Sequence, residues 1–306
     1  MSRWHRRQFL GISVGSLAVA VLTPWRKLWA APAHPDLVDV SGSDPATMVQ
    51  AAVKALGGMG RFVRKGDHVV LKPNAAFANP PDWACTTHPA TVAAVAKLCL
   101  EAGAKSVTVV EYPQAKADKC LDRCGLTAAL AALPEVKIKL LAGKADFKKR
   151  QVKGGKVLKE VEVAKAVLSA DVLINLPAAK AHNETGVSLG LKNAMGLIYD
   201  RKVFHTMFDL HQGVADLGKA IVPQLTIVDA TRALLTNGPA GPGETATPGR
   251  MVAGTDVVAV DAYALRVARF NNRQMTLADA RHIQLAGQDG VGRTDVDALK
   301  VHTVKV

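Results

Sequence analysis

Lysine, histidine and amide side chains are concentrated in two neighbouring segments. Residues 180–183 read KAHN and residues 190–196 read GLKNAMG. Lysine and amide groups donate hydrogen bonds to carboxylates and phosphates, and glycine lets a ligand approach the backbone closely. His182 could transfer a proton or bind a metal. We therefore predict a site for a small anionic ligand, with these catalytic residues: Lys180, His182, Lys192 and Asn193.

A third group of polar residues follows at helical spacing. The segment 204–216 is predicted to form one helix, on which His205, Asp209, Gln212 and Asp216 share a face at intervals of three and four. A carboxylate on such a face could orient a histidine toward the site. The alternative is an exposed polar face that only caps the helix. On the first interpretation, His205 joins the predicted catalytic residues.

The segment Thr86-Thr87-His88-Pro89 marks the start of another helix. Unpaired N–H groups and the helix dipole favour anions at such a position, so His88 is a candidate ligand contact. The alternative is that Thr87 or His88 merely caps the helix.

Three cysteines occupy predicted loops or a first helical turn: Cys85, Cys120 and Cys124. They could ligate a metal, and an iron–sulfur cluster is one candidate, although such a cluster normally takes four thiolates. A cluster shared across a two-fold homodimer, with two cysteines from each subunit, would supply that number. The competing interpretation is a disulfide between Cys120 and Cys124. Cys99 lies on the apolar face of a predicted helix and is most simply a core residue.

These residues need a scaffold, and the rest of the chain alternates short apolar strands with amphipathic helices. Helices are predicted from Asp44 to Gly57 and from Pro89 to Gly103. Strands are predicted at 68–72, 106–112, 171–177 and 225–230, with an antiparallel or edge strand at 251–254. A hairpin is expected through Gly154-Gly155. The pattern predicts an α/β fold, with a mostly parallel sheet flanked by helices and a small hairpin insertion.

Polar residues lie just beyond the carboxyl ends of nearly all these strands. In open α/β sheets, ligands bind in the crevice outside those ends. Lys180, His182 and Glu111 occupy such positions. The predicted substrate-binding residues are Lys72, Asn74, His88 and Asp229. The glycine-rich loop at 237–243 has no Walker or dinucleotide fingerprint, and it is expected only to line the crevice.

The first 33 residues have the organisation of an export signal: a basic start, an apolar run and a small-residue exit at Ala31-Pro32-Ala33. Arg6-Arg7-Gln8-Phe9-Leu10 is typical of substrates of the twin-arginine translocase, the expected partner during export. An uncleaved membrane anchor is the alternative, but the apolar run is short for a spanning helix. We expect a periplasmic protein with a single domain at residues 34–306.

The chain is basic, with a formal net charge of +13. The signal holds five arginines and lysines and no acid, which leaves +8 for residues 34–306. We interpret the basic residues as spread along the chain rather than clustered in a patch. We therefore expect an anionic small molecule and no nucleic acid as partner.

The order of the segments resembles the DUF362 family of uncharacterised proteins. The resemblance rests on this series of motifs: 86–89 (TTHP), 101–104 (EAGA), 170–177 (ADVLINLP) with Lys180 and His182, 191–193 (LKN) with Gly196, 204–205 (FH), 227–230 (IVDA), 237–239 (NGP), 255–256 (TD) and 259–262 (AVDA). The family is commonly described as iron–sulfur-associated, and some relatives carry an added ferredoxin-type domain that this sequence lacks. The organisation is also loosely similar to that of nickel-pincer racemases.

Three functions fit these observations. The first is a periplasmic redox protein with a metal or iron–sulfur cluster and a small anionic substrate. The second is a metal-free enzyme that uses lysine and histidine for proton transfer on a carboxylate-bearing substrate. The third is a binding protein that captures the same class of ligand without catalysis.

Overall fold

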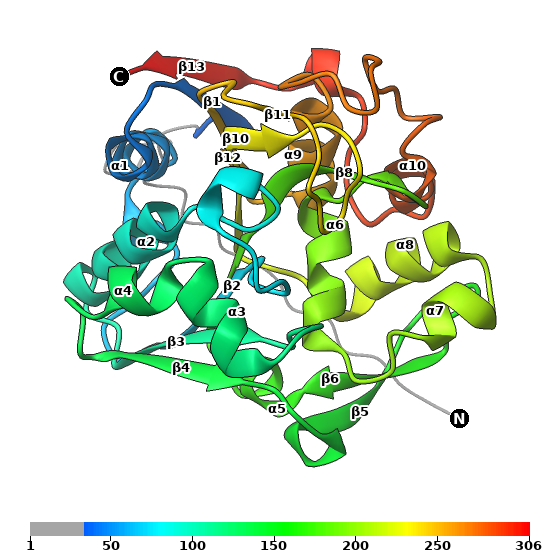
Figure 1. The fold of residues 1–306 in the computed structure, drawn as a ribbon, viewed down its shortest axis with the longest axis horizontal. Helices are drawn as coiled ribbons and strands as arrows, with labels where there is room; N and C mark the ends of the chain where they lie inside the picture. Colours follow the sequence, from blue (N-terminus) through cyan, green and yellow to red (C-terminus); the bar gives the residue numbers. More distant parts are fainter. Residues whose placement is uncertain (1–33) are drawn as a thin grey trace, which may run out of the picture. The chain divides into compact units, whose positions relative to one another are not determined.

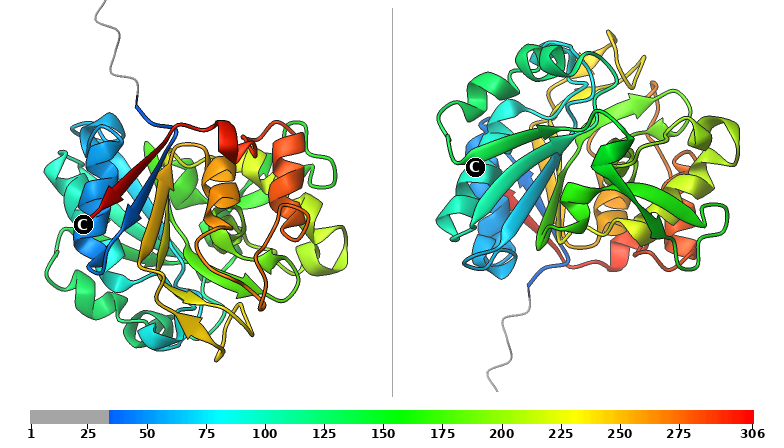
Figure 2. Two further views of the ribbon diagram at one scale, coloured as in Figure 1. Left: turned by 90° about the horizontal axis from the view of Figure 1, so that it is seen from above. Right: turned by 90° about the horizontal axis from the view of Figure 1, so that it is seen from below.

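Apolar residues on both sides of the strands produce a sheet with two buried faces. In strand β2 (His68–Pro73), Val69 and Leu71 belong to one core, and Val70 belongs to the other. Successive strand residues point to opposite faces, so both faces must be covered. Helices α1 and α2 cover one face, and α6, α8 and α9 cover the other (Figures 1 and 2).

The computed structural model describes residues 34–306, which form one compact unit, and the predicted export signal lies outside them. Within this range, eleven strands form a sheet with the main order β13-β1-β12-β10-β7-β2-β3-β4, from which β8, β9 and β11 branch. Neighbours run parallel from β10 to β4 and between β1 and β13, whereas β12 is antiparallel to both β1 and β10. The predicted α/β fold with a mostly parallel sheet is confirmed.

The strands have these bounds: β1 (Leu37–Ser41), β2 (His68–Pro73), β3 (Ser106–Glu111), β4 (Val136–Leu140), β5 (Phe147–Gln151), β6 (Glu160–Ala164), β7 (Val172–Leu176), β8 (Ala178–His182), β9 (Gly186–Val187), β10 (Leu225–Leu234), β11 (Thr245–Ala246), β12 (Arg250–Gly254) and β13 (Val301–Lys305). The predicted hairpin is formed by β5 and β6, which pair antiparallel as a separate two-stranded sheet.

The α-helices have these bounds: α1 (Pro45–Ala55), α2 (Pro89–Glu101), α3 (Ala117–Arg123), α4 (Leu126–Leu130), α5 (Lys165–Leu168), α6 (Leu189–Asn193), α7 (Val203–Thr206), α8 (Leu210–Ala220), α9 (Val257–Ala264) and α10 (Arg281–Gln288). Short 3-10 helices occupy η1 (Met59–Arg61), η2 (Pro81–Trp83), η3 (Lys144–Asp146), η4 (Ala194–Leu197) and η5 (Val296–Ala298). No helix of residues 34–306 is long and apolar enough to cross a membrane.

Of two expectations about the elements, one is confirmed and one is corrected. Strand β12 was expected to be antiparallel or at the edge, and it is antiparallel to both of its neighbours, β1 and β10. The single helix expected from Phe204 to Asp216 is two helices, α7 and α8. Asp209 takes a non-helical conformation between them and caps α8, accepting hydrogen bonds from the N–H groups of His211 and Gln212. An aspartate that can cap a new helix competes with continuing the old one.

Positive charge is also less evenly spread than we expected. Residues 137–165 contain ten lysines and arginines against three acids, so this stretch carries +7 of the +8 in residues 34–306. It forms β4, the hairpin β5–β6 and the start of α5, and its basic side chains are exposed or half-buried. Lys137 and Lys139 on the outer strand β4 disfavour pairing with another sheet edge.

Ile174 tests the packing of the central sheet. It is fully buried in β7, between β10 and β2. Because an alanine would leave a cavity in the core, Ile174→Ala should lower the free energy of unfolding by about 2–5 kcal/mol in urea titrations. The matched control is Ile138→Ala on β4, where the side chain is 38% exposed, and a change below about 1 kcal/mol is expected there. Equal losses at both positions would contradict this description of the core.

Candidate functional site

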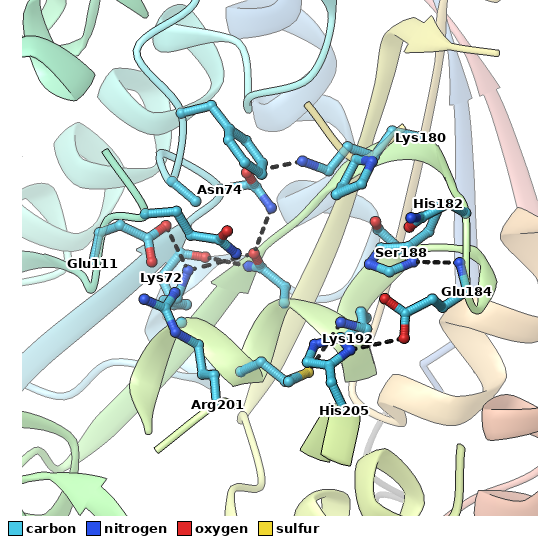
Figure 3. A pocket seen from close by; sticks show the side chains of 18 residues that line it. Lys72, Asn74, Glu111, Lys180, His182, Glu184, Ser188, Lys192, Arg201 and His205 are labelled. Atoms are coloured by element: carbon cyan, nitrogen blue, oxygen red, sulfur yellow. Dashed lines mark hydrogen bonds and ion pairs between the residues drawn. The ribbon is translucent and has the colours of Figure 1, made fainter. Parts of the chain in front are cut away.

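A cavity of about 320 Å³ lies at the carboxyl ends of β2, β3 and β8. Among its lining residues are seven that the sequence predicted: Lys72, Asn74, Lys180, His182, Lys192, Asn193 and His205. Figure 3 shows the side chains that line the cavity, with six of these seven residues labelled. All five residues predicted to be catalytic are therefore brought together, and so are two of the four predicted to bind substrate.

Lys72 and Glu111 form a buried ion pair at one end of the cavity. The distance from Lys72 Nζ to Glu111 Oε2 is 2.9 Å, and each residue is only 1% exposed. Oε2 also accepts the N–H of Ala75 at 2.8 Å, and Oε1 accepts that of Tyr112 at 2.9 Å. Burial lowers the pKa of Lys72, and Glu111 opposes that shift. The charge of Lys72 is thus balanced inside the protein rather than offered to a ligand.

The pair is packed against the backbone at Gly196. A Cβ atom added at this position would clash with Glu111 Oε1 and would lie 2.8 Å from Lys72 Nζ. Because glycine has no Cβ atom, the Lys72 and Glu111 side chains can lie close to the backbone at this position.

Asparagine side chains link Lys72 to Lys180 through a series of hydrogen bonds. Asn193 donates through Nδ2 to Lys72 O at 3.0 Å and to Asn175 Oδ1 at 2.9 Å. Its Oδ1 accepts from Asn74 Nδ2 at 3.2 Å, and Asn74 Oδ1 in turn accepts from Lys180 Nζ at 3.2 Å. The donors of Asn193 are fully used, so this residue holds the network together. The sequence predicted its place correctly, but the contacts favour a structural role.

Lys180 projects from β8, the short strand that continues beyond β7 after Pro177. It is 1% exposed, and its ammonium donates to Cys85 O at 2.5 Å and to Asn74 Oδ1 at 3.2 Å. The ring of Phe77 lies 4.7 Å from Nζ. Burial lowers the pKa of Lys180 to about 7, so a large fraction of this side chain is a neutral amine at neutral pH. A neutral amine can accept a proton.

His182 follows Lys180 by two residues and points to the same side of the strand. Its Nδ1 accepts the N–H groups of Glu184 at 3.2 Å and Thr185 at 3.3 Å. Burial, aided by nearby Lys192, lowers the pKa of His182 to about 2. The ring is therefore neutral, and these contacts assign its proton to Nε2. His182 can donate a hydrogen bond from Nε2, whereas binding a metal there would force the proton onto Nδ1 against two backbone donors.

Lys192 is carried by α6, and a buried carboxylate holds the first turn of that helix. Asp261 accepts the N–H of Gly190 at 2.7 Å and that of Leu191 at 2.8 Å. Lys192 Nζ donates to Met195 Sδ at 3.0 Å, which is a weak acceptor. Burial lowers the pKa of Lys192 to about 8. This lysine is mostly charged at neutral pH and has donors to spare.

Arg201, Glu184 and His205 also line the cavity, and Arg201 and Glu184 were not predicted. Arg201 donates to Tyr112 O at 2.8 Å, and its guanidinium carbon lies 4.3 Å from the centre of the Tyr112 ring. His205 Nδ1 lies 2.8 Å from Glu184 Oε2, and these side chains are 34% and 47% exposed. This pair therefore stands at the rim. Residues 178–205 have no clean helical or strand period, so only their polarity could have indicated these positions.

Neither carboxylate of the predicted face is the partner of His205: Asp209 caps α8, and Asp216 holds a loop. Asp216 accepts the N–H groups of Val157 and Leu158 at 2.8 and 3.0 Å, which fixes the loop of the hairpin. Glu184 is the partner of His205 instead.

His88 and Asp229 do not line the cavity. His88 caps α2, and its Nδ1 accepts the N–H of Ala90 at 3.1 Å. Asp229 accepts the N–H of His88 at 2.8 Å and the hydroxyl groups of Thr91 and Thr231 at 3.0 and 2.6 Å. These contacts join α2 to β10, which favours the capping alternative for His88.

The side chains of the cysteines are buried. Cys85, Cys120 and Cys124 are all fully buried, and no disulfide joins Cys120 to Cys124. Burial raises the pKa of Cys124 to about 11, with smaller contributions from the other two thiols. Cys99 lies in the core as expected.

These thiols do not fit the predicted iron–sulfur site. Within residues 34–306, no three or more His, Cys, Asp and Glu side chains are grouped so as to hold a metal ion. Fully buried thiols also cannot reach a second subunit to share a cluster. Cluster binding stays a prediction of the sequence, and no step below passes through it.

Asp261 provides a test of how α6 is held. Burial raises its pKa to about 7, although the two N–H groups oppose the shift. Between pH about 4 and 7 the folded chain then binds more protons at Asp261 than the unfolded chain, so this residue makes stability fall as pH rises. Asp261→Asn should remove that decline, seen as a smaller difference between urea midpoints at pH 5 and pH 8. An unchanged pH dependence would contradict the assignment. Asp297→Asn, at an exposed acid, is the matched control.

Comparisons with known proteins identify the family of this chain. The family model "Domain of unknown function (DUF362)" matches residues 69–266, more than half of the chain. A "Thylakoid-associated protein" of Synechocystis sp. is 31% identical over 222 residues, which are 70% of this chain and 66% of that protein. The structure of the lactate racemase apoprotein from Thermoanaerobacterium thermosaccharolyticum matches with a TM-score of 0.42 and 11% sequence identity. The match covers 62% of this chain and 50% of the racemase chain. On its match to the family model, this chain belongs to the DUF362 family.

Proposed function

We propose that the chain is an enzyme that transfers a proton at a carbon next to the carboxylate of a small anionic substrate. The observation that carries the proposal is Lys180, a fully buried lysine in the cavity with no carboxylate within ion-pair distance among residues 34–306. A catalytic base works best when its pKa lies near the working pH. The pKa of Lys180, about 7, meets that condition.

The neighbours of Lys180 suit the charge that such a reaction develops. The neutral amine of Lys180 takes a proton from the C–H bond beside the carboxylate, and the electron pair of that bond moves toward the carboxylate oxygens. The Lys192 ammonium and the Nε2–H group of His182 both line the cavity and can stabilise the added negative charge. Return of a proton from Lys180 to the carbon closes the cycle without any co-reactant, and in D2O the atom returned is a deuteron.

Deuterium exchange tests this proposal. With a panel of small carboxylic acids in D2O, the wild type should replace the C–H proton by deuterium, followed as loss of its NMR signal. The rate should rise with pH through about 7 as Lys180 loses its proton, and it should fall above about 8 as Lys192 loses its charge. Lys180→Gln should slow exchange by about 100-fold or more, because the base is removed.

Lys202→Gln is the control for this experiment. Lys202 is exposed and does not line the cavity, so its replacement should leave exchange unchanged. Saturable binding of an acid without exchange would contradict the enzyme and would favour a non-catalytic binding protein. Full exchange activity in Lys180→Gln would contradict the assigned base.

We also propose that the protein works in the periplasm after twin-arginine export, a proposal supported by Arg6-Arg7 before Phe9-Leu10. Replacing both arginines by lysine keeps the charge but changes the pair that the translocase recognises. The variant should therefore accumulate in the cytoplasm, as measured by cell fractionation. Lys65→Arg, at an exposed position of the folded part, should be exported like the wild type. Unchanged export of the double-lysine variant would contradict this route.

A further inference from the structure

We propose that the ligand of this cavity carries two separate anionic groups, one bound by Arg201 and the other by Lys192. The inference rests on the proposed function only in taking the cavity as the anion site. It adds the substrate class: a short dicarboxylate, or a carboxylate with a phosphate at its other end.

The charges that line the cavity do not cancel. Four side chains are cationic, namely Lys72, Lys180, Lys192 and Arg201, and two are carboxylates, Glu111 and Glu184. Glu111 pairs with Lys72, and Glu184 pairs with His205. The other three cations have no carboxylate within 4.0 Å among residues 34–306. With Lys180 protonated and the histidines neutral, the lining carries a formal +2, which a ligand with two negative charges would balance.

Arg201 is held rigidly at one end of the cavity. It donates to Tyr112 O at 2.8 Å and to Pro113 O at 3.3 Å, and the Tyr112 ring lies against its guanidinium. The rings of Phe147 and Tyr199 back this contact, each within about 6.4 Å of Tyr112. A guanidinium has five N–H groups, so three remain for a ligand. Such a fork matches the oxygens of a carboxylate or a phosphate.

Lys192 lies on a different side of the same space. Figure 3 shows the Arg201 guanidinium beside the Lys72–Glu111 pair, and the Lys192 side chain beside His205. Two N–H groups of the Lys192 ammonium remain after its contact with Met195 Sδ. Arg201 comes from the connection between η4 and α7, whereas Lys192 comes from α6. The two cations are thus placed independently, as recognition of two groups requires.

The cavity also limits the length of the ligand. Its volume of about 320 Å³ is at the lower end of the range for small-molecule sites, which run from about 300 to 1,000 Å³. A molecule of a few carbons with an anionic group at each end fits this size and the arrangement of charge.

Isothermal titration calorimetry at pH 7.5 on the full chain tests the inference, with succinate, its monomethyl ester and 2-phosphoglycolate as probes. The wild type should bind succinate about tenfold or more tightly than the ester, because the ester offers one charge instead of two. Arg201→Gln and Lys192→Gln should each reduce this ratio to near one. Lys202→Gln, next to Arg201 but exposed, should keep the wild-type ratio. Tighter binding of 2-phosphoglycolate than of succinate would identify a phosphate as the second group.

Proton uptake gives a second readout that does not depend on turnover. Burial holds the pKa of Lys180 near 7 and that of Lys192 near 8, and a bound dianion would raise both values. Binding should therefore take up protons at pH 7.5, seen as a dependence of the heat on the ionisation enthalpy of the buffer.

Each result decides a separate question. Equal affinity for succinate and its ester, or a preference that survives Arg201→Gln, would overturn the two-group ligand. Deuterium exchange on monocarboxylates would still stand in that case and would support the proposed function. Tight binding of succinate that both variants weaken, without exchange on any acid, would support the two-group ligand and overturn the proposed chemistry. Absence of binding by all three probes would overturn the two-group ligand.

Discussion

The buried ion pair between Lys72 and Glu111 is the interaction on which the rest of the site depends. Two charges removed from water destabilise a fold unless their remaining hydrogen-bonding positions are filled. Here the carboxylate of Glu111 accepts hydrogen bonds from Lys72 and from the N–H groups of Ala75 and Tyr112. All of these groups lie at the carboxyl ends of the adjacent strands β2 and β3. The pair fixes the position of these two strand ends relative to each other. It also sets the polarity of the cavity that opens beside them.

Hydrogen bonds of amide side chains connect the ion pair to Lys180 at the other end of the cavity. Asn193 and Asn74 connect Lys72 to Lys180, which stands on a strand that pairs with β10 and not with β2 or β3. Hydrogen bonds in a low-dielectric interior are strong, and the loss of one partner is costly. Lys180 is therefore kept in one place although it lacks a counter-charge. Its lowered pKa follows from that position, because burial acts on it without the compensation that Lys72 receives.

Strands and helices with a clear period were predictable from the sequence, and so was the edge of the sheet where the site lies. Lys180 and His182 could be recognised because they follow a buried strand by a few residues. Arg201 could not, because the backbone between α6 and α7 has no repeating pattern and its course is set by tertiary contacts such as the pairing of Ile198 with Val163. The break between α7 and α8 was missed because Asp209, which caps α8, stands at helical spacing from His205 and Gln212. The contact of Asp261 with α6 could not be predicted either, because it joins residues about seventy positions apart.

Polar residues whose hydrogen-bonding groups are all used by the protein can be distinguished from those that keep unused donors, and we assign structural roles to the first kind. Asp229 and Asn193 have their hydrogen-bonding groups engaged by the protein, and each can be explained by what it holds together. Lys192 and Arg201 keep N–H donors that are not bonded to any group of residues 34–306, and both side chains line the cavity. Folding alone does not require such an arrangement, because placing like charges together in a low dielectric opposes stability. The anion proposed above would supply the missing negative charge and remove that cost on binding, so the same feature that weakens the empty fold would provide affinity for it.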